Sequence, residues 1–481
     1  MKTLKSLLSG VYEGEVPDIE IADICTDSRQ VKNGDLFICL SGGNFDGHDY
    51  SLEAEMLGAA AIVCEHAVES GLFQAIVSDT RKAYSLICGN FFDNPARDMK
   101  FAAVVGTNGK TSTASVLRCI LERAGHVTGQ IGTTGVKMPD KVYDTGMTTP
   151  DPYELNRYLK KMRKAGVDTV ICEVTAHAIF WKKTYGIKAD YAIFTNVSKD
   201  HLDFFGDMET YAGVKRGYFS PDNVKVAVVN SDDENGRAII SAARTAVFSY
   251  GINQPADVFA IDIRHSDRGL EFVINLFDDV FGIAVPLYGR HNVYNVLAAA
   301  TLAKLMGVDG AVIKEALENA DEIEGRFNIF YYNGAKIIVD FAHTPDGLDN
   351  LLQAAAEITD GKIVTVFGCG GNRDRTKRAE MGTVAGMRSD EVVITSDNPR
   401  YEQPMDIISD ILPGVKRCGA EYIIIQNRKE AIAYAISRAG RGDTVVIAGK
   451  GGEKYTEVKG KKIAYSDENS VKAFIEGGRI D

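Results

Sequence analysis

The clearest chemical signal in this sequence is a short glycine-containing segment between an apolar run and an amphipathic stretch, Gly106-Thr107-Asn108-Gly109-Lys110-Thr111-Ser112. Glycines let the backbone approach phosphate oxygens, and the start of the following helix supplies N–H donors and partial positive charge. Lys110 adds a full positive charge, and Thr111 is placed to bind Mg²⁺. A strict Walker A motif would need glycine where the chain has Val104, so the segment is a shortened GxxGKT variant. It predicts a site for the phosphates of a nucleotide.

Further along the chain lie residues suited to divalent cations. Glu173 lies at the end of the apolar run TVICEV, His201 lies just beyond YAIFTN, and Lys215 lies in the helical stretch TYAGVKRGYF. Carboxylate and imidazole groups at strand ends beside a phosphate loop are typical of sites where Mg²⁺ bridges ATP oxygens. A GTPase would carry an NKxD motif for guanine, and no such motif follows this loop. The set therefore indicates ATP chemistry, and a ligase rather than a motor.

These residues can form one site only if the fold brings several strand ends together, and the hydrophobic pattern predicts such a fold. Apolar runs of strand length alternate with helix-length amphipathic segments, namely the runs 101–105, 169–174, 191–196 and 225–230. The alternation restarts near residue 325 with the runs 336–343, 362–371, 391–397, 421–426 and 444–452. This pattern is typical of parallel sheets covered by helices on both faces, which place ligand sites at the carboxyl ends of their strands. We therefore predict an α/β fold.

The length of the chain and the polar breaks between its apolar runs indicate three domains. The chain has 481 residues, which is too long for one hydrophobic core. The first hundred residues mix short strands with turns, such as DGHDY (46–50) and the apolar run AAAIVCE (59–65). A polar break at 94–100 then precedes the run at 101–105. We predict domains at 1–98, 99–324 and 325–481.

Composition disfavours several other classes of protein. No run of 18 apolar residues is available to cross a membrane, and the start MKTLKSLLSG is too polar for a secretory signal. Eight cysteines without a CxxC pair indicate free thiols in a reducing compartment. The formal net charge of −12 argues against a general nucleic-acid surface. We expect a cytoplasmic, monomeric protein whose partners are small molecules, with no nucleic acid and no membrane insertion.

Taken together, these segments resemble the Mur ligase superfamily. The resemblance covers nearly the whole chain and rests on the phosphate loop and on the motifs EVTAHA (173–178), TNVSKDHLD (195–203), YAGVK (211–215), YGRHNVYN (288–295), EGRF (324–327) and VDFAHTPDG (339–347). It implies an N-terminal α/β domain that binds UDP, a central P-loop ATPase-like domain with a parallel sheet, and a C-terminal Rossmann-like domain that binds the amino acid.

Within the superfamily, the chain looks most like the members that add an amino acid to UDP-N-acetylmuramoyl-L-Ala-D-Glu during peptidoglycan synthesis. This narrower resemblance rests on the segment 26–50 and on the motifs GMTTPDP (146–152), GNRDR (371–375) and SDNPR (396–400). The implied activity is that of an ATP-dependent acid–amino-acid ligase. A carboxylate is a poor acyl donor, so ATP would convert it to an acyl-phosphate, which the amine then attacks through a tetrahedral intermediate. Lys110, metal ions and helix N–H donors would stabilise the charge that builds on the oxygens.

The resemblance also implies roles for individual residues. Contacts to the nucleotide-sugar and its peptide would come from Thr26, Ser28, Gly43, Asn44, Phe45, Thr148, Thr149, Thr175, Trp181 and Lys183. Mg²⁺ would be held by Thr111, Glu173, His201 and a carbamate on Lys215, and the ATP nucleotide by Asn292, Arg326 and Asp340. His343 would reach the phosphates when the C-terminal domain closes. The amino acid would meet Arg373, Asp397, Asn398, Pro399, Arg400, Gly449 and Glu453.

The chain departs from the family pattern at several of these positions. The two serines usual after the magnesium glutamate are Thr175 and Ala176, and a glutamine and an arginine further on are Trp181 and Lys183. Lysine keeps the charge of arginine but lacks its bidentate fork. The usual GKGHE reads GKGGE, so a histidine is lost at Gly452. These changes affect the expected grip on the muramyl-peptide and on the head of the amino acid.

We expect the added amino acid to be meso-diaminopimelate. It carries one carboxylate more than lysine, and arginine is the side chain suited to grip a carboxylate at two points. Arg400 in DNPR matches the signature of the diaminopimelate-adding members, unless it only caps a helix or pairs with Glu402. Lysine or ornithine is the alternative amino acid. A folylpolyglutamate-like ligase is an alternative enzyme, which would lack the separate N-terminal domain, and a non-catalytic scaffold would not need the retained lysines and metal-site residues.

Overall fold

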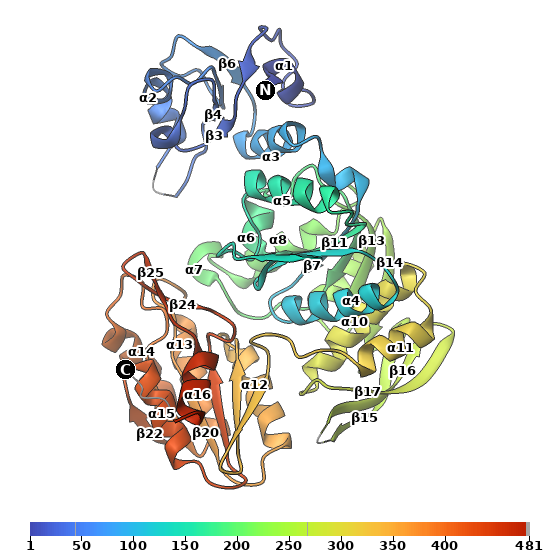
Figure 1. Ribbon diagram of the computed structural model, residues 1–481, viewed down its shortest axis with the longest axis vertical. Coiled ribbons are helices and arrows are strands. Elements are labelled where there is room, and N and C mark those ends of the chain that lie inside the picture. The colour runs from blue at the N-terminus through green and yellow to red at the C-terminus, as the bar shows by residue number, and fades with distance from the viewer. Residues whose placement is uncertain (44, 267, 478–481) are drawn as a thin grey trace.

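The computed structural model describes residues 1–43, 45–266 and 268–477, and it has three lobes that follow one another along the chain (Figure 1). Each lobe is built on its own sheet, with four strands in the N-terminal lobe, 11 in the central lobe and six in the C-terminal lobe. The prediction of a three-part α/β fold is confirmed. The predicted boundary at 98/99 falls between a turn at Pro95–Asp98 and a strand at Lys100–Val105, and that at 324/325 falls in a linker. The boundaries themselves stay a prediction.

The N-terminal lobe holds a small parallel sheet in the order β3-β4-β5-β6. The strands of the whole lobe are β1 (Lys2–Thr3), β2 (Glu20–Ile21), β3 (Ile24–Cys25), β4 (Leu36–Ile38), β5 (Ala61–Cys64) and β6 (Phe73–Ile76), of which β1 and β2 pair with each other. Its helices are α1 (Leu4–Leu7), α2 (Ser51–Met56) and α3 (Thr80–Phe91), with the 3-10 turns η1 (Ser28–Gln30), η2 (Gly47–Tyr50) and η3 (Pro95–Asp98). The apolar run at 59–65 is thus a buried strand, as its composition indicates.

The central sheet is parallel in its middle and antiparallel at both edges. Its order is β10-β9-β8-β11-β7-β12-β13-β14-β15-β16-β17, and the pairs from β8 to β15 are parallel. The strands are β7 (Lys100–Val105), β8 (Thr128–Gly132), β9 (Gly135–Met138), β10 (Lys141–Tyr143), β11 (Thr169–Val174), β12 (Ala189–Phe194), β13 (Val224–Asn230), β14 (Ala246–Gly251), β15 (Val258–Ser266), β16 (Gly269–Leu276) and β17 (Asp279–Val285). The four predicted runs are its central strands.

Helices cover both faces of this sheet because its central strands are apolar on both faces. In β7, Ala102 and Val104 face one core, whereas Phe101, Ala103 and Val105 face the other. The first core lies under α4 (Lys110–Arg123), α10 (His291–Leu305) and α11 (Gly310–Glu318). The second lies under α5 (Pro152–Lys164), α6 (Ala176–Phe180), α8 (Met208–Tyr218) and α9 (Glu234–Ala242), with α7 (Leu202–Phe205) beside them.

The C-terminal lobe repeats this architecture around the order β18-β19-β23-β20-β21-β22, in which only the pair β18–β19 is antiparallel. The strands are β18 (Asn328–Tyr332), β19 (Ala335–Asp340), β20 (Ile363–Phe367), β21 (Glu391–Ile394), β22 (Glu421–Ile424) and β23 (Thr444–Ala448), followed by the hairpin of β24 (Tyr455–Val458) and β25 (Lys461–Ala464). The helices are α12 (Pro345–Glu357), α13 (Thr376–Arg388), α14 (Pro404–Cys418), α15 (Arg428–Arg438) and α16 (Asp467–Ile475). All five predicted runs are strands.

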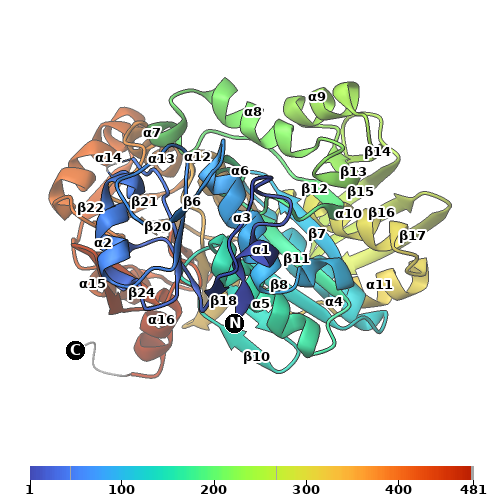
Figure 2. The ribbon, with the colours of Figure 1, turned by 90° about the horizontal axis from the view of Figure 1, so that it is seen from above.

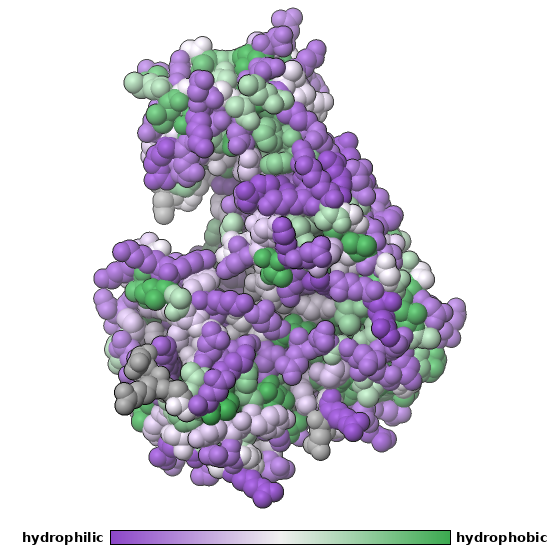
Figure 3. Space-filling model, viewed as in Figure 1, coloured by the Kyte–Doolittle hydropathy of each residue, from purple (hydrophilic) through white to green (hydrophobic). Residues whose placement is uncertain are grey.

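The lobes leave an open cleft on one side of the molecule. Figures 1 and 2 place the C-terminal lobe and strands β15–β17 at opposite ends. Figure 3 shows the surface deeply hollowed between the N-terminal and C-terminal lobes. The central and C-terminal lobes touch at the phosphate loop, where Asn108 Nδ2 donates to Asp346 Oδ2 at 2.8 Å. Among the described residues, no helix is both long and apolar enough to cross a membrane.

Candidate active site between the central and C-terminal lobes

The phosphate loop joins the carboxyl end of β7 to the start of α4. Gly106 packs so closely on β12 that a Cβ atom would lie 1.8 Å from Thr195 Oγ1. Gly109 has φ of 83°, and its Cβ would lie 2.5 Å from Asn295 Oδ1. The ammonium of Lys110 folds back over the loop and donates to the carbonyls of Gly106 (2.9 Å) and Thr107 (2.8 Å). Because the first amides of α4 have no carbonyl within the helix to bind, the loop fits a phosphate group.

Beside the loop, Thr111 and Glu173, which the sequence analysis assigned to Mg²⁺, lie in direct contact. Thr111 Oγ1 donates to Glu173 Oε2 at 2.9 Å, and Arg326 Nη2 donates to Thr111 Oγ1 at 3.1 Å. Glu173 is fully buried and also accepts from the amide and hydroxyl of Thr133, each at 3.1 Å. A Cβ on Gly132 would lie 1.9 Å from Glu173 Oε1, so glycine is needed there. A hydroxyl and a buried carboxylate are hard oxygen donors that suit Mg²⁺.

His201 and His343 meet at one carboxylate that the sequence analysis did not single out. Asp200 Oδ2 lies 3.3 Å from His201 Nε2 and 3.9 Å from His343 Nε2. Burial lowers the pKa of His201 to about 3 and that of His343 to about 4. Both imidazoles are therefore neutral near pH 7 and can offer a lone pair. Lys377 of the C-terminal lobe also binds Asp200, with Nζ 3.2 Å from Oδ1.

Lys215 is fully buried on α8 without a carboxylate partner among the residues the structure describes. Its ammonium donates to Tyr211 Oη at 2.6 Å and to Thr107 Oγ1 at 2.7 Å. Burial and then the nearby Lys110 lower the pKa of Lys215 well below its ordinary value. A neutral amine at this position is nucleophilic, which is the property that a carbamate-forming lysine needs. Within the described chain, no group of three or more His, Cys, Asp and Glu side chains is arranged to hold a metal.

The residues predicted to bind the ATP nucleotide are Asn292, Arg326 and Asp340. They come from α10, from the linker before β18 and from the end of β19. Asn292 Oδ1 accepts from Asn295 Nδ2 at 2.8 Å, and Asn295 Oδ1 accepts from Thr113 of α4 at 3.1 Å. Asp340 ends β19, and its two oxygens accept the amides of Phe327 (2.8 Å) and Ala342 (2.7 Å). These bonds fix the carboxylate in place and leave only its outer lone pairs for a ribose. Burial raises the pKa of Asp340 despite Arg326 nearby.

The residues predicted to contact the muramyl-peptide gather around Glu173. Thr133 Oγ1 lies 3.0 Å from Thr148 Oγ1, and Thr149 Oγ1 donates to the Glu173 carbonyl at 2.8 Å. Thr175 Oγ1 accepts from Thr149 at 3.3 Å and caps α6. Lys183 donates to the Thr149 carbonyl at 3.3 Å and pairs with Asp151 at 2.8 Å. The structure thus brings the three predicted threonines and Lys183, together with Thr133, to the edge of the proposed metal site.

Trp181 lies slightly apart, where the central lobe meets the N-terminal lobe. The Arg81 guanidinium of α3 lies 3.8 Å from the centre of its ring. Arg81 also donates to the carbonyl of Ser41, at the start of the loop that carries Gly43 and Phe45. Ring contacts continue from Trp181 to Phe204 (5.6 Å), from Phe204 to His177 (4.6 Å) and from His177 to His201 (4.7 Å). Aromatic packing therefore links the two lobes to the site.

The predicted nucleotide-sugar residues line one end of the N-terminal sheet. Ser28 is buried and donates to Glu53 Oε2 at 2.6 Å, and Thr26 is partly exposed just before it. Phe45 is 58% exposed, and a Cβ on Gly43 would meet nothing within 4 Å, so this loop is open to a ligand. Asn44 lies outside the described residues.

The predicted amino-acid residues form a second cluster at the strand ends of the C-terminal lobe. Arg400 pairs with Glu457 of β24 at 3.0 Å and donates to the Gly371 carbonyl at 2.8 Å. The alternative pairing with Glu402 is wrong, because Glu402 instead binds the buried Arg378 at 2.8 Å.

A buried lysine holds the rest of this cluster together. Lys450 binds Asn398 Oδ1 (2.8 Å), Glu453 Oε2 (3.1 Å) and the Tyr455 carbonyl (2.9 Å). Asp397, before Asn398 and Pro399, packs on Gly449, whose Cβ would lie 2.9 Å from Asp397 Oδ2. The loop carrying DNPR and the loop carrying GKGGE therefore form one unit.

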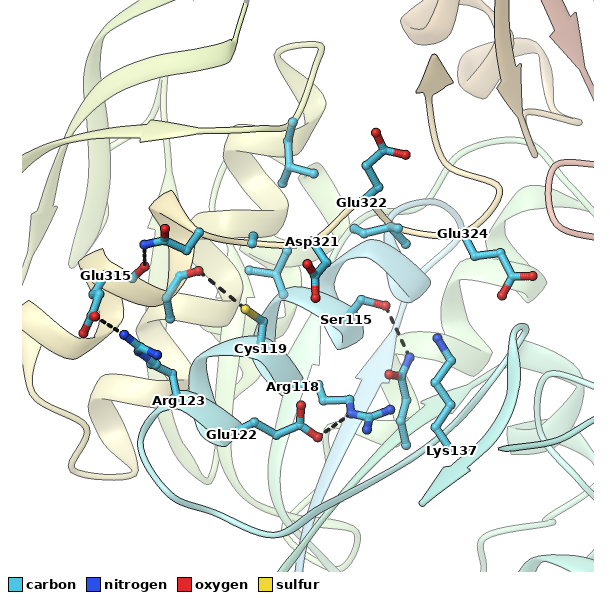
Figure 4. A pocket seen from close by; sticks show the side chains of 17 residues that line it. Ser115, Arg118, Cys119, Glu122, Arg123, Lys137, Glu315, Asp321, Glu322 and Glu324 are labelled. Atoms are coloured by element: carbon cyan, nitrogen blue, oxygen red, sulfur yellow. Dashed lines mark hydrogen bonds and ion pairs between the residues drawn. The ribbon is translucent and has the colours of Figure 1, made fainter. Parts of the chain in front are cut away.

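Two cavities flank these clusters. One of about 760 Å³ lies between Asp203 of α7 and the C-terminal lobe, and Arg373 lines it with Asn372, Tyr401 and Glu402. The other, of about 570 Å³, lies along α4 under the linker that leads to the C-terminal lobe (Figure 4). Figure 4 shows Lys137 and Glu324 at one end of it, and the pair of Arg123 and Glu315 at the other. None of the predicted site residues lines this second cavity.

Several residues of these clusters were not predicted, among them Asp200, Lys377, Arg81 and Glu457. Asp200 lies next to His201 in SKDHLD, and Lys377 lies four residues after Arg373 in GNRDRTK. Their closeness to these motif residues is the sequence signal that could have identified them. Arg81 and Glu457 lie in segments without a motif, and only the packing of separate lobes and loops reveals them.

Comparison with known proteins gives matches over nearly the whole chain. Three family models match: "Mur ligase family, catalytic domain" over residues 20–93, "Mur ligase middle domain" over 104–303, and "Mur ligase, glutamate ligase domain" over 325–451. The chain is 39% identical to the UDP-N-acetylmuramoyl-L-alanyl-D-glutamate–2,6-diaminopimelate ligase of Bacillus licheniformis, over 96% of each chain. It is also 39% identical to the ligase of that name from Clostridium botulinum, over 95% of each chain. A solved structure of a ligase of that name has a TM-score of 0.70 and 28% identity, covering 99% of both chains.

Proposed function

The chain belongs to the Mur ligase family, and from this premise we propose that it joins meso-diaminopimelate to the D-glutamyl carboxylate of UDP-N-acetylmuramoyl-L-alanyl-D-glutamate with ATP. The observation that carries the proposal is the near full-length similarity to diaminopimelate ligases, supported by the presence of Arg400 in the DNPR loop. The reaction belongs to ATP-dependent peptide synthesis for the bacterial cell wall. A monomeric state and a cytoplasmic location are part of the same proposal.

In this proposal the phosphate loop binds ATP and the central lobe activates the carboxylate. The amides of α4 and the Lys110 ammonium meet the phosphates, and Arg326 adds charge from the linker at Thr111. Lys110→Ala should abolish ADP formation and leave the fold intact, because it removes a charge aimed at the transferring phosphoryl group. Near-normal turnover in this variant, with unchanged circular dichroism, would overturn the assignment of the ATP site.

Divalent cations and a modified lysine complete the site in this proposal. Thr111, Glu173 and His201 would hold Mg²⁺, which supplies charge neutralisation for the phosphates when bound. Lys215, with its lowered pKa, would react as a neutral amine with CO₂, forming an N–C bond and releasing one N–H proton to solvent, and become an anionic carbamate. The hydroxyls of Tyr211 and Thr107 already bind its nitrogen and would orient that group.

The N-terminal lobe would hold the nucleotide-sugar through Thr26, Ser28 and the loop at Gly43, Asn44 and Phe45. Thr148, Thr149, Thr175 and Lys183 would present the peptide carboxylate to the phosphates. Ser28→Ala should weaken binding of the UDP-muramyl-dipeptide and leave ATP affinity unchanged, as measured by calorimetric titration of each ligand. Equal affinities in both proteins would remove Ser28 from the proposed site.

The amino acid would bind in the C-terminal lobe, with its distal carboxylate on Arg400. Arg373 lies close by, because a Cβ on Gly370 would be 2.8 Å from Arg400 Nη1 and 3.8 Å from Arg373 Cγ. Arg400 is paired with Glu457 through Nε, and a distal carboxylate would add a second charged contact that lysine does not offer, so such a site favours diaminopimelate. The test is the ratio of kcat/KM for meso-diaminopimelate and L-lysine, in wild type and in Arg400→Ala. Preference of wild type for lysine, or an unchanged ratio in the variant, contradicts the assignment.

Three alternative functions make different predictions in the same assay. A ligase for lysine or ornithine would release phosphate with those amino acids and not with diaminopimelate. A folylpolyglutamate-like ligase would release it with folate and glutamate, and would have no use for the nucleotide-sugar lobe. A non-catalytic protein would release none.

A further inference from the structure

The hairpin β24–β25 is joined to the DNPR loop by backbone hydrogen bonds. The Arg400 amide donates to the Glu457 carbonyl at 3.0 Å, and the Lys459 amide donates to the Arg400 carbonyl at 2.7 Å. The Glu457 amide donates to Asn398 Oδ1 at 2.9 Å, and the same oxygen accepts from the buried Lys450 at 2.8 Å. The backbones on either side of the Arg400–Glu457 ion pair are thus fixed to one another.

Arg400 itself is held in an unusual conformation. Its φ is 51°, in the left-handed region that a long side chain rarely adopts, so the surrounding bonds must maintain it. Its Nε binds Glu457, and its Nη1 binds the Gly371 carbonyl. Among the contacts of the described residues, Nη2 has no acceptor, and the side chain is 17% exposed. The guanidinium is therefore orientated in advance, with one end free for a carboxylate.

The charges around Arg400 also favour the binding of an anion. Burial and then Arg400 lower the pKa of Arg373, so the two guanidiniums repel each other. Arg373 donates only to the carbonyl of Asn372 among the described groups, at 3.0 Å. Glu457 is the carboxylate that binds Arg400 directly, and its side chain is 27% exposed. A ligand that brings one more carboxylate relieves this repulsion, while Glu457 remains free to accept a further hydrogen bond.

A guanidinium and a carboxylate side by side match one chemical group in particular. The distal carbon of diaminopimelate bears a carboxylate and an ammonium on the same atom. The carboxylate suits the free end of Arg400, and the ammonium then falls toward the acid that already binds that arginine. Lysine has an ammonium at the same distance along its chain but no carboxylate, whereas 2-aminopimelate has the carboxylate but no distal ammonium. The contributions of the distal carboxylate and of the distal ammonium can therefore be measured separately by comparing these amino acids.

We propose that Glu457 is a specificity-determining residue that binds the distal ammonium of the amino-acid substrate, while Arg400 binds the distal carboxylate. The proposal rests on the proposed function and adds to it a recognition of the distal amine. Glu457 lies on a hairpin outside the motifs that carry the family resemblance. Its role is assigned by the Arg400–Glu457 contact and by the backbone bonds that hold both residues.

The experiment measures kcat/KM of the full-length enzyme at saturating ATP and UDP-muramyl-dipeptide. The three amino acids are meso-diaminopimelate, L-2-aminopimelate and L-lysine. Glu457→Gln should reduce kcat/KM by roughly tenfold to a hundredfold for diaminopimelate and lysine, the range expected for a lost charged hydrogen bond. It should leave 2-aminopimelate unchanged, so the preference for diaminopimelate over 2-aminopimelate falls by the same factor. Arg400→Gln should show the reciprocal pattern, in which lysine is spared.

A matched control is Glu421→Gln, which removes an exposed carboxylate from β22 in the same lobe and should change none of these values. An equal loss for all three amino acids in Glu457→Gln would overturn the proposal, because the effect would then not depend on the distal ammonium. A loss for diaminopimelate and 2-aminopimelate that spares lysine would overturn it too, because Glu457 would then act only by positioning Arg400. No loss for any of them would also overturn it. If wild type uses lysine and not diaminopimelate, the proposed substrate is wrong. The role of Glu457 is then tested by the ratio of kcat/KM for lysine and norleucine, in wild type and in Glu457→Gln. An unchanged ratio in the variant refutes that role.

Discussion

Asp200 and Lys377 form an ion pair between the central and C-terminal lobes, with Oδ1 and Nζ 3.2 Å apart. The side chains are only 6% and 7% exposed. Burial alone would raise the pKa of Asp200, but Lys377 and then His201 and His343 lower it to well below its ordinary value. The pair therefore joins the two lobes at the edge of the proposed phosphate site, where an acyl-phosphate would have to be kept from water.

Lys377→Met should weaken this contact. Removing one partner of a buried ion pair costs about 3–5 kcal/mol, so we expect the closed arrangement to be depopulated and ADP formation to fall roughly a hundredfold or more. Small-angle X-ray scattering should report a larger radius of gyration, and Lys377→Arg should resemble wild type. The double variant Asp200→Asn, Lys377→Met tests the pairing, because it leaves no buried charge behind. A Lys377→Met protein with wild-type scattering and turnover contradicts the prediction.

Lys215→Ala should remove most of the activity, because the proposed carbamate would be lost. Wild-type protein grown with ¹³C-bicarbonate should give a carbamate carbon signal in NMR, and Lys215→Ala should give none. Short carboxylates such as acetate should restore part of the activity of the alanine variant by entering the space that the side chain leaves. A matched control is Lys225→Ala, which removes an exposed lysine on β13 that pairs with Asp190. An active Lys215→Ala protein without any carbamate signal in wild type would refute the modification.

The sequence predicted the sheets better than the contacts between them. Apolar runs such as 169–174 and 444–448 are strands because both faces of each run are buried, which is a local property of the residues. The antiparallel strands β15–β17 were missed, since alternating patterns such as that of Val258–Ser266 are only half apolar. Lys110 and Thr111 could be placed from the loop alone. The partner of Arg400 could not, because Glu457 reaches it only through the pairing of a distant hairpin.

Acid should destabilise the protein through histidines whose pKa is lowered in the folded state. Burial lowers the pKa of His291 to about 4, whereas a histidine in the unfolded chain titrates near about 6.5. Between these values the unfolded state binds more protons than the native state, so the free energy of unfolding falls as the pH falls from about 6.5 to about 4. Above about 6.5 this group contributes no pH dependence.

The measurement is urea unfolding across this pH range, followed by circular dichroism, in wild type and in His291→Gln. The variant should show a shallower decline, because position 291 no longer takes up a proton on unfolding. His343 shifts in the same direction, with a pKa lowered by burial to about 4, so some decline should persist. Identical slopes for wild type and variant would show that His291 does not titrate as its burial indicates.

The contact between Arg81 and Trp181 should report binding of the nucleotide-sugar. Trp181 is the single tryptophan of the chain, so protein fluorescence excited near its absorption comes from this site. Arg81 lies over its ring and also holds the Ser41 carbonyl beside the loop of Gly43 and Phe45. A ligand that contacts this loop should therefore change the surroundings of the indole. Titration with UDP-muramyl-dipeptide should change the emission, and ATP alone should not.

Arg81→Ala tests whether this contact also matters for affinity. A cation–π contact contributes about 0.5–2 kcal/mol, so KM for the nucleotide-sugar should rise roughly two- to thirtyfold while KM for ATP stays constant. Arg97→Ala is the matched control, since Arg97 is an exposed arginine of η3 in the same lobe and should behave as wild type. Because the proposed catalytic groups lie around Glu173, kcat should change little in either variant. If the emission is unaffected by the nucleotide-sugar and Arg81→Ala keeps the wild-type KM, then Trp181 and Arg81 only join the lobes.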